Sequence, residues 1–109
     1  PTNNIEIRNP DPSANPYLAA TAILAAGLDG IKKKMKVPAE AKGNLYQKSN
    51  YERLPSSLDE ALEVTSRDKV IVDAIGIPLF ENFKALKTKE LSDYRKHVPI
   101  WDFNMYFNV

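Results

Sequence analysis

The sequence contains no cysteine, which excludes disulfide bonds, thiol catalysis and metal sites built from cysteine. This absence is compatible with a reducing compartment, and we expect a cytoplasmic protein. A long hydrophobic run is also lacking: the longest, residues 17–28, has about a dozen residues, whereas a membrane span needs about 20. The net charge is only +1, so the chain gives no electrostatic argument for binding nucleic acid or a membrane.

What the sequence does have is an ordinary globular composition, with 43% hydrophobic and 27% charged residues in a chain of 109. A chain of this length can bury one modest core, and it has no room for two. We therefore expect a single packed unit. The sequence begins at Pro1 rather than at a methionine, and we expect it to be a piece of a longer protein.

An acid and a base, Glu6 and Arg8, lie two residues apart near the start of the chain. Residues 5–8 alternate between apolar and polar, which predicts a short strand whose side chains at i and i+2 point the same way. The prolines within residues 9–13 then predict a turn. Such a pair is more often a surface pair than a reaction centre, so its spacing alone does not predict catalysis.

A long helix is predicted over residues 13–36. Ser13 or Asn15 can cap its N-terminus, and Pro16 suits its first turn. Apolar and small residues lie nearly all round this helix, so we expect it to be buried. The four lysines within residues 32–36 suit the negative end of the helix dipole and predict a solvated helix end.

Periodicity disappears over residues 37–56, which predicts a loop of a length that is usually functional or disordered. Residues 57–97 then carry repeated helix signals. The chain from the turn onward is therefore expected to be mostly helical. The predicted fold class is mainly α, with a short N-terminal strand remnant and turn over residues 1–9.

The helix signals after the loop are capping residues. Ser57 and Glu60 form the S-x-x-E pattern of a capping box, and Asp68 can cap a second helix. Gly76 can close that helix. Pro78 suits the first turn of a third and longer helix.

The tail, residues 98–109, is rich in aromatic side chains: Trp101, Phe103, Tyr106 and Phe107. Their spacing fits either a helix or a strand. Burying one aromatic side chain stabilises a protein by about 1.5–3 kcal/mol, so a terminus with this much apolar area is not a typical frayed end. We expect the tail to dock, either on its own fold or on another subunit.

Sequence motifs for an autonomous enzyme are missing. The chain has no phosphate-binding loop, no dinucleotide-binding fingerprint and no histidine pair at metal-binding spacing. Its single histidine, His97, has no acid–base partners nearby in the sequence and is expected to face solvent or cap a helix. On these grounds the chain alone is not expected to be an enzyme.

Three ordered strings change this interpretation. Residues 6–8 (EIR), 10–19 (PDPSANPYLA) and 25–31 (AAGLDGI) closely resemble the carboxy-terminal part of the catalytic domain of bacterial-type (type I) glutamine synthetase. Residues 44–46 (NLY) and 54–62 are similar to the segments that follow in that family. The aromatic ending, residues 106–109, looks like that family's carboxy terminus, so the resemblance covers essentially the whole chain.

The resemblance implies an ATP-dependent glutamate–ammonia ligase that makes glutamine through a γ-glutamyl phosphate. It implies that Glu6 is a ligand of Mg²⁺ or Mn²⁺ and that Arg8 contacts the glutamate carboxylate or the acyl phosphate. ATP would be a co-substrate, and the chain would form the helical C-terminal portion of an α+β catalytic domain. The family forms double-ringed dodecamers, in which the tail inserts into a subunit of the opposite ring. A fragment of this size would be inactive alone, because most of the site is missing.

Two positions depart from the family pattern. The family usually has an arginine where this chain has Asn4, which leaves open a related ligase that joins glutamate to another amine. Tyr46 occupies the position of a tyrosine that some bacterial members carry as an adenylylation site, but the residues after it differ from the context of those members. The remaining alternative is a non-enzymatic helical interaction module, in which the acid–base pair is incidental.

Overall fold

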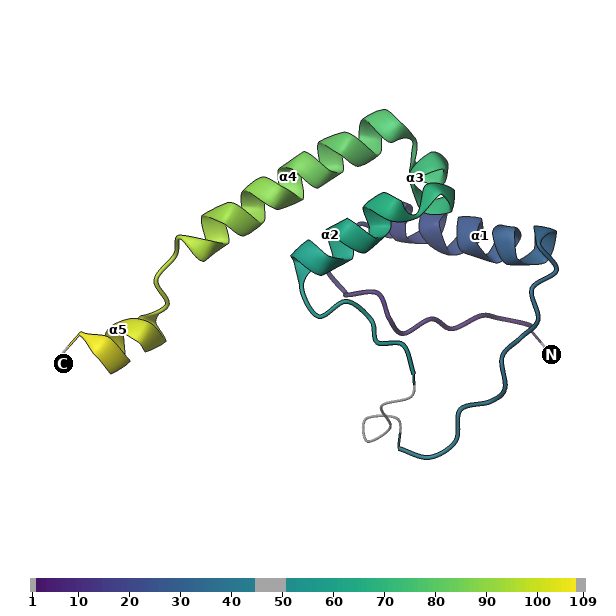
Figure 1. The fold of residues 1–109 in the computed structure, drawn as a ribbon, viewed down its shortest axis with the longest axis horizontal. Helices are drawn as coiled ribbons and strands as arrows, with labels where there is room; N and C mark the ends of the chain where they lie inside the picture. Colours follow the sequence, from purple (N-terminus) through teal and green to yellow (C-terminus); the bar gives the residue numbers. More distant parts are fainter. Residues whose placement is uncertain (1, 45–50, 108–109) are drawn as a thin grey trace.

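The computed structural model of the chain describes residues 2–44 and 51–107. Within these ranges all regular secondary structure is helical (Figure 1). The helices in chain order are α1 (Pro16–Lys32), α2 (Leu58–Arg67), α3 (Lys69–Ile75), α4 (Ile77–Arg95) and α5 (Ile100–Tyr106). The prediction of a mainly α fold is confirmed.

Helix α1 begins where a polar side chain can accept hydrogen bonds from the N–H groups of its first turn. Asn15, rather than Ser13, caps α1: its Oδ1 accepts hydrogen bonds from the N–H groups of Tyr17 at 2.9 Å and Leu18 at 3.2 Å. Pro16 is the first helical residue, as its fixed φ favours. The helix ends at Lys32, four residues before the predicted boundary at residue 36.

Residues 57–97 contain three helices, as the capping residues predict. Ser57 caps α2, because its Oγ accepts from the N–H of Glu60 at 3.2 Å. The carboxylate of Glu60 reaches one residue further back than in a standard capping box and accepts from the N–H of Ser56 at 2.7 Å. Asp68 caps α3, and Gly76, with φ at 90°, separates α3 from α4.

The strand expected over residues 5–8 is not formed. A strand is stabilised by backbone hydrogen bonds to a neighbouring strand, and residues 2–44 and 51–107 contain no second strand to supply them. The segment before α1 is therefore an extended, exposed stretch of chain that runs past the helices (Figure 1).

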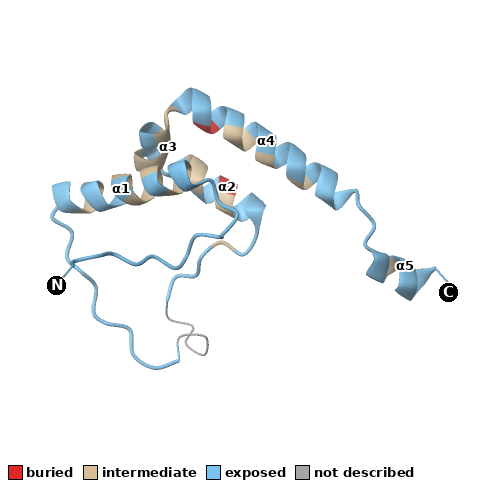
Figure 2. Cartoon of the chain, turned by 180° about the vertical axis from the view of Figure 1, so that it is seen from behind, coloured by how far each residue is buried: buried red, intermediate tan, exposed pale blue. Residues whose placement is uncertain are grey.

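The core is small. Leu62 on α2 and Phe80 on α4 are the buried hydrophobic residues of the described chain, and Phe80 is only 2% exposed (Figure 2). The radius of gyration is 18.5 Å, against about 13 Å for a compact domain of this length. The helices α2, α3 and α4 pack on one another, and much apolar surface stays uncovered.

The prediction that α1 is buried is wrong for this chain. The helix packs along α3, and none of its residues is buried. Tyr17, Leu24, Leu28 and Ile31 are exposed, Tyr17 by 81%. A helix that is apolar on several sides needs several neighbours, and among the described helices α1 has only α3.

The tail is helical, so of the two conformations that its aromatic spacing allowed, helix and strand, the helix is the one that forms. Its helix α5 makes no packing contact with another of the described helices and lies apart from them beyond the end of α4 (Figure 1). The part of the tail that the structure describes, up to residue 107, therefore does not dock on the other helices. None of the helices within the described residues is long and apolar enough to cross a membrane.

Candidate functional site

Glu6 and Arg8 form an ion pair at the surface. The Nε of Arg8 donates to Oε1 of Glu6 at 2.7 Å, and the two side chains keep 84% and 68% of their surface exposed, respectively. The predicted orientation, with both groups on one side of the chain, is confirmed. An exposed pair of this kind stabilises a protein by only about 0–1 kcal/mol. Either side chain can therefore leave the other and bind a ligand at a small cost in free energy.

The elbow, residues 9–15, joins this pair to α1. Within it, Oδ1 of Asp11 accepts two hydrogen bonds from Ser13: one from the backbone N–H at 2.8 Å and one from the hydroxyl at 2.5 Å. The N–H of Ala14 donates to the carbonyl oxygen of Asp11 at 2.9 Å. The elbow ends at Asn15, the cap of α1, so hydrogen bonds hold both the turn at residues 11–14 and the start of the helix.

These hydrogen bonds favour the ionised form of the acceptor. They hold the pKa of the Asp11 carboxyl below its usual value, the hydroxyl of Ser13 contributing most and the backbone N–H of Ser13 next. The same chemistry occurs before α2, where the backbone N–H of Ser56 and then its hydroxyl lower the pKa of Glu60. Both carboxylates are thus held as acceptors at neutral pH.

A complete metal site does not form among the residues that the structure describes, since no three His, Cys, Asp or Glu side chains converge there. Magnesium prefers six oxygen ligands and commonly takes one or two protein carboxylates together with water and substrate phosphates. The exposed carboxylate of Glu6 can supply one such oxygen. The donor groups of the described residues therefore do not form a complete site for a metal ion by themselves.

A shallow cavity of about 660 Å³ lies between the elbow and α4. Asp11, Ser13 and Asn15 line its polar side, and Phe83 and Leu86 of α4 lie among the residues opposite. The helices α1 and α4 do not pack on each other. The elbow is therefore shaped by its own hydrogen bonds rather than by packing against α4.

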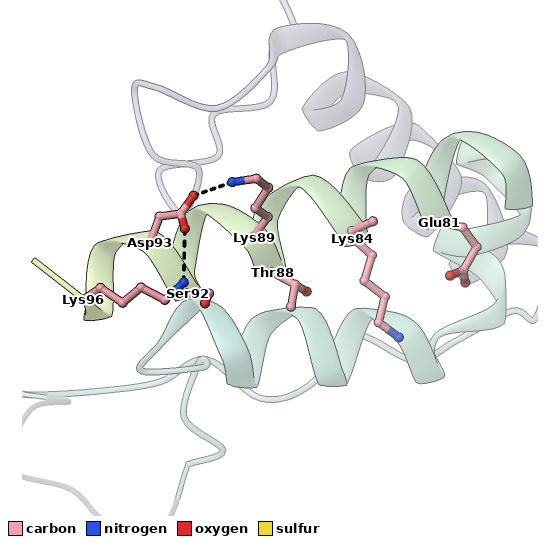
Figure 3. Close-up of a pocket in the computed structure, with 8 residues that line it drawn as sticks. Glu81, Lys84, Thr88, Lys89, Ser92, Asp93 and Lys96 are labelled. Atoms are coloured by element: carbon pink, nitrogen blue, oxygen red, sulfur yellow. Dashed lines mark hydrogen bonds and ion pairs between the residues drawn. The ribbon is translucent and has the colours of Figure 1, made fainter.

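A second groove, of about 610 Å³, runs along α4 (Figure 3). Three of its charged side chains pair with one another: Asp93 accepts from Nζ of Lys89 at 2.6 Å and lies 3.6 Å from Nζ of Lys96. These residues are exposed. The groove is accordingly a solvated helix face.

The remaining predicted residues lie apart from the elbow or outside the described chain. His97 is exposed, as expected, and its N–H donates to the carbonyl oxygen of Tyr94 at 3.0 Å. In the tail, Phe103 and Phe107 stack with ring centroids 4.3 Å apart. Trp101 and Tyr106 pack edge to face, with ring centroids 6.2 Å apart. All four rings are exposed. Tyr46 lies outside the described residues.

Sequence reasoning missed the bonding between Asp11 and Ser13. The signal was present as Asp-Pro-Ser, because an aspartate commonly accepts from the backbone N–H two residues later. The two prolines beside it predicted the turn without showing which side chain would hold it. The ion pair of Arg95 with Asp59, which links α4 to α2, was also missed, since it spans 36 positions.

Comparison with known proteins identifies the chain. Residues 1–106 match the family described as "Glutamine synthetase, catalytic domain". Curated relatives named glutamine synthetase include those of Methanococcus voltae, 40% identical over 96% of this chain and 25% of the relative, and Thermotoga maritima, 43% identical over 94% and 25%. A glutamine synthetase of Staphylococcus aureus is 41% identical over 96% of this chain and 25% of the relative.

These matches define the class first: the chain is a helical part of a catalytic domain of the kind that the family model describes. The chain belongs to the glutamine synthetase family, and the resemblance of its motifs is confirmed. It spans about a quarter of the length of the curated relatives that it matches.

Proposed function

We propose that this chain is part of an ATP-dependent glutamate–ammonia ligase, which makes glutamine through a γ-glutamyl phosphate. Membership of the glutamine synthetase family supports this reaction. The observation that carries the proposal for this chain is the exposed pair of Glu6 and Arg8, which immediately precedes the PDPSANPYLA string. The carboxylate and the guanidinium lie together, and both side chains are exposed.

Arg8 is proposed to bind the substrate carboxylate or the acyl phosphate formed from it. A guanidinium is a planar cation with parallel donors, which matches the oxygen pairs of a carboxylate or a phosphate. Arg8 already holds a carboxylate oxygen, that of Glu6, at 2.7 Å. In the working enzyme a substrate group would take the place of this partner.

Glu6 is proposed to contribute one carboxylate to a site for Mg²⁺ or Mn²⁺. Phosphoryl transfer from ATP needs divalent cations that neutralise charge on the nucleotide phosphates, and hard cations take oxygen ligands. Since the described residues offer no further converging donors, the other ligands must come from other parts of the protein. The chain alone is accordingly expected to be inactive.

The tail is proposed to dock on another subunit of a double-ringed dodecamer, in the cytoplasm. Its four aromatic rings are exposed and α5 touches no other described helix, so it has apolar area to bury and no partner within those residues. Burial of each ring would stabilise the assembly by about 1.5–3 kcal/mol.

The test is a steady-state assay of the intact protein with glutamate, ammonia and ATP. Replacing Glu6 by alanine is expected to lower kcat/KM by about a hundredfold, the usual cost of removing one group from an electrostatic site, and to raise the requirement for divalent metal. The matched control is Glu63→Ala, which breaks another exposed pair, with Arg67 on α2, and should leave the kinetics unchanged. Wild-type kinetics in the Glu6→Ala protein would contradict the proposed role.

A second candidate function is favoured by Asn4, which is exposed two residues before Glu6. An asparagine there removes a cation that glutamine synthetases usually have, so a ligase that joins glutamate to another amine is the alternative. Assaying a panel of amines beside ammonia separates the two. Robust formation of glutamine from ammonia excludes the alternative, whereas activity only with another amine establishes it.

A further inference from the structure

Helix α4 runs back along α2, and an ion pair joins the last turn of α4 to the first turn of α2 (Figure 3). In the middle of α2, Leu62 is buried, and it lines a cavity together with Thr88 of α4. Nearer the tail, the guanidinium of Arg95 donates to Oδ2 of Asp59, which lies 36 positions earlier. Both contacts are internal to residues 57–97, and neither depends on whether further chain covers the outer faces of these helices.

The two charges of this pair also suit the helix ends on which they lie. Asp59 is in the first turn of α2, where the helix dipole is positive, and Arg95 is in the last turn of α4, where the dipole is negative. The last carbonyl groups of a helix have no intrahelical partner, so its last turn frays readily. A contact at Arg95, the last residue of α4, therefore holds the turn from which the tail starts.

The connection from α4 to the tail helix is short and leaves few backbone torsions free. The N–H groups of Lys96 and His97 donate back to carbonyl oxygens in the last turn of α4, at 3.2 Å and 3.0 Å. Pro99 has a fixed φ and restricts Val98 before it, and α5 begins at the next residue, Ile100. These restraints are local, so the direction of α5 follows that of the last turn of α4.

We propose that Arg95 is a positioning residue, which through its ion pair with Asp59 fixes the direction in which α5 leaves α4 to dock. This inference rests on the proposed function, since it concerns the docking of the tail on another subunit. A segment that is already held in its bound direction loses less conformational freedom on association, so the pair favours assembly. An exposed pair shifts such an equilibrium by up to about fivefold, and a pair that the assembly covers shifts it by more.

The first measurement is the assembly of the intact protein on dilution, followed by mass photometry. Arg95→Gln removes the cation and is expected to raise the concentration of half-dissociation by about fivefold or more. Arg95→Lys keeps a cation and should recover most of this loss. Asp59→Asn should cost about as much as Arg95→Gln, and a protein with both substitutions should lose no more than either, because the same pair is broken each time.

The matched control is Arg67→Gln. Arg67 is also an exposed cation in the last turn of its helix, and it also forms an exposed pair, with Glu63, but both residues lie on α2. Its loss removes the same charge from a helix end without releasing α4, so half-dissociation should stay within about twofold of wild type. Wild-type assembly of the Arg95→Gln protein, or losses at Asp59 and Arg95 that add in the double variant, would overturn the proposal.

The second measurement reports the direction of α5 rather than the strength of assembly. Spin labels are attached through Val64→Cys on α2 and Asn104→Cys on α5, two exposed positions, and pulsed electron paramagnetic resonance gives the distances between them in dissociated subunits of the intact protein. Arg95→Gln should broaden this distribution, and Arg67→Gln should not. Equal widths in the wild-type and Arg95→Gln proteins would overturn the proposal. If the wild-type protein does not assemble, the proposed docking fails, while these distances still decide the role of Arg95.

Discussion

The elbow and the tail helix α5 are both at the surface, yet they are held in different ways. In the elbow, Asp11 and Asn15 bond to groups two or three residues away, so its shape is complete within the chain. In and just after α5, the aromatic rings pair with rings of the same segment and stay exposed, Trp101 by 61%. Polar contacts can be satisfied locally, whereas apolar area needs a large partner surface.

This difference separates two kinds of function. A segment that is shaped locally, as the elbow is, keeps its conformation without a partner surface. A segment that exposes apolar area is suited to association, as α5 is proposed to do in an oligomer. Breaking each kind of contact should therefore change a different property of the intact protein.

The largest effect is expected from removing the tail helix. Truncation after Pro99 deletes all four tail rings and should abolish assembly of the dodecamer, because each ring would otherwise contribute about 1.5–3 kcal/mol on burial. Light scattering coupled to size-exclusion chromatography measures the molar mass. The control is Tyr94→Ala, which removes an aromatic side chain that is 75% exposed on α4. A truncated protein that still assembles fully would show that α5 is not an interface.

A smaller effect is expected from a single aromatic substitution, and its size should depend on burial. Phe80→Ala removes a ring that is 2% exposed and should lower the free energy of unfolding by about 3–5 kcal/mol. Phe103→Ala removes a ring that is half exposed and stacks on Phe107. Because such a stacked pair contributes about 1 kcal/mol, this variant should lower the free energy of unfolding by that amount or less. Urea unfolding of dissociated subunits compares the two, and equal losses would contradict the exposure of α5.

The sequence was sufficient where a structural feature depends on neighbours in the chain. Asn15, Ser57 and Asp68 cap helices as predicted, because a cap needs only a polar side chain and amides two or three residues later. The common orientation of Glu6 and Arg8 was predicted for the same reason. Local chemistry fixed these features before any packing was considered.

The sequence was insufficient where a feature depends on distant partners. The strand over residues 5–8 was predicted from alternation, but a strand also needs a neighbour to bond to. The burial of α1 was predicted from its composition, but the described chain packs only α3 against it. The metal site is incomplete for the same reason, since Glu6 is one ligand and the others are not among the described residues. These expectations are properties of an assembly larger than the chain.

The smallest expected effect is the response of the elbow to acid. The pKa of Asp11 is lowered in the folded protein by its two hydrogen bonds to Ser13, whereas in the unfolded chain it is about 4. The stabilisation is therefore fully present above about pH 4, and it is lost as the pH falls through the lower folded value. Hydrogen–deuterium exchange, read by mass spectrometry on peptides covering residues 9–15, should show protection that decreases in that window.

The peptides around Ser56 and Glu60 should respond in the same way, because the pKa of Glu60 is lowered by the same kind of contact. Asp11→Asn should remove the pH dependence at the elbow and leave that at Glu60 intact, and an elbow that keeps its pH dependence in this variant would show that another group controls it.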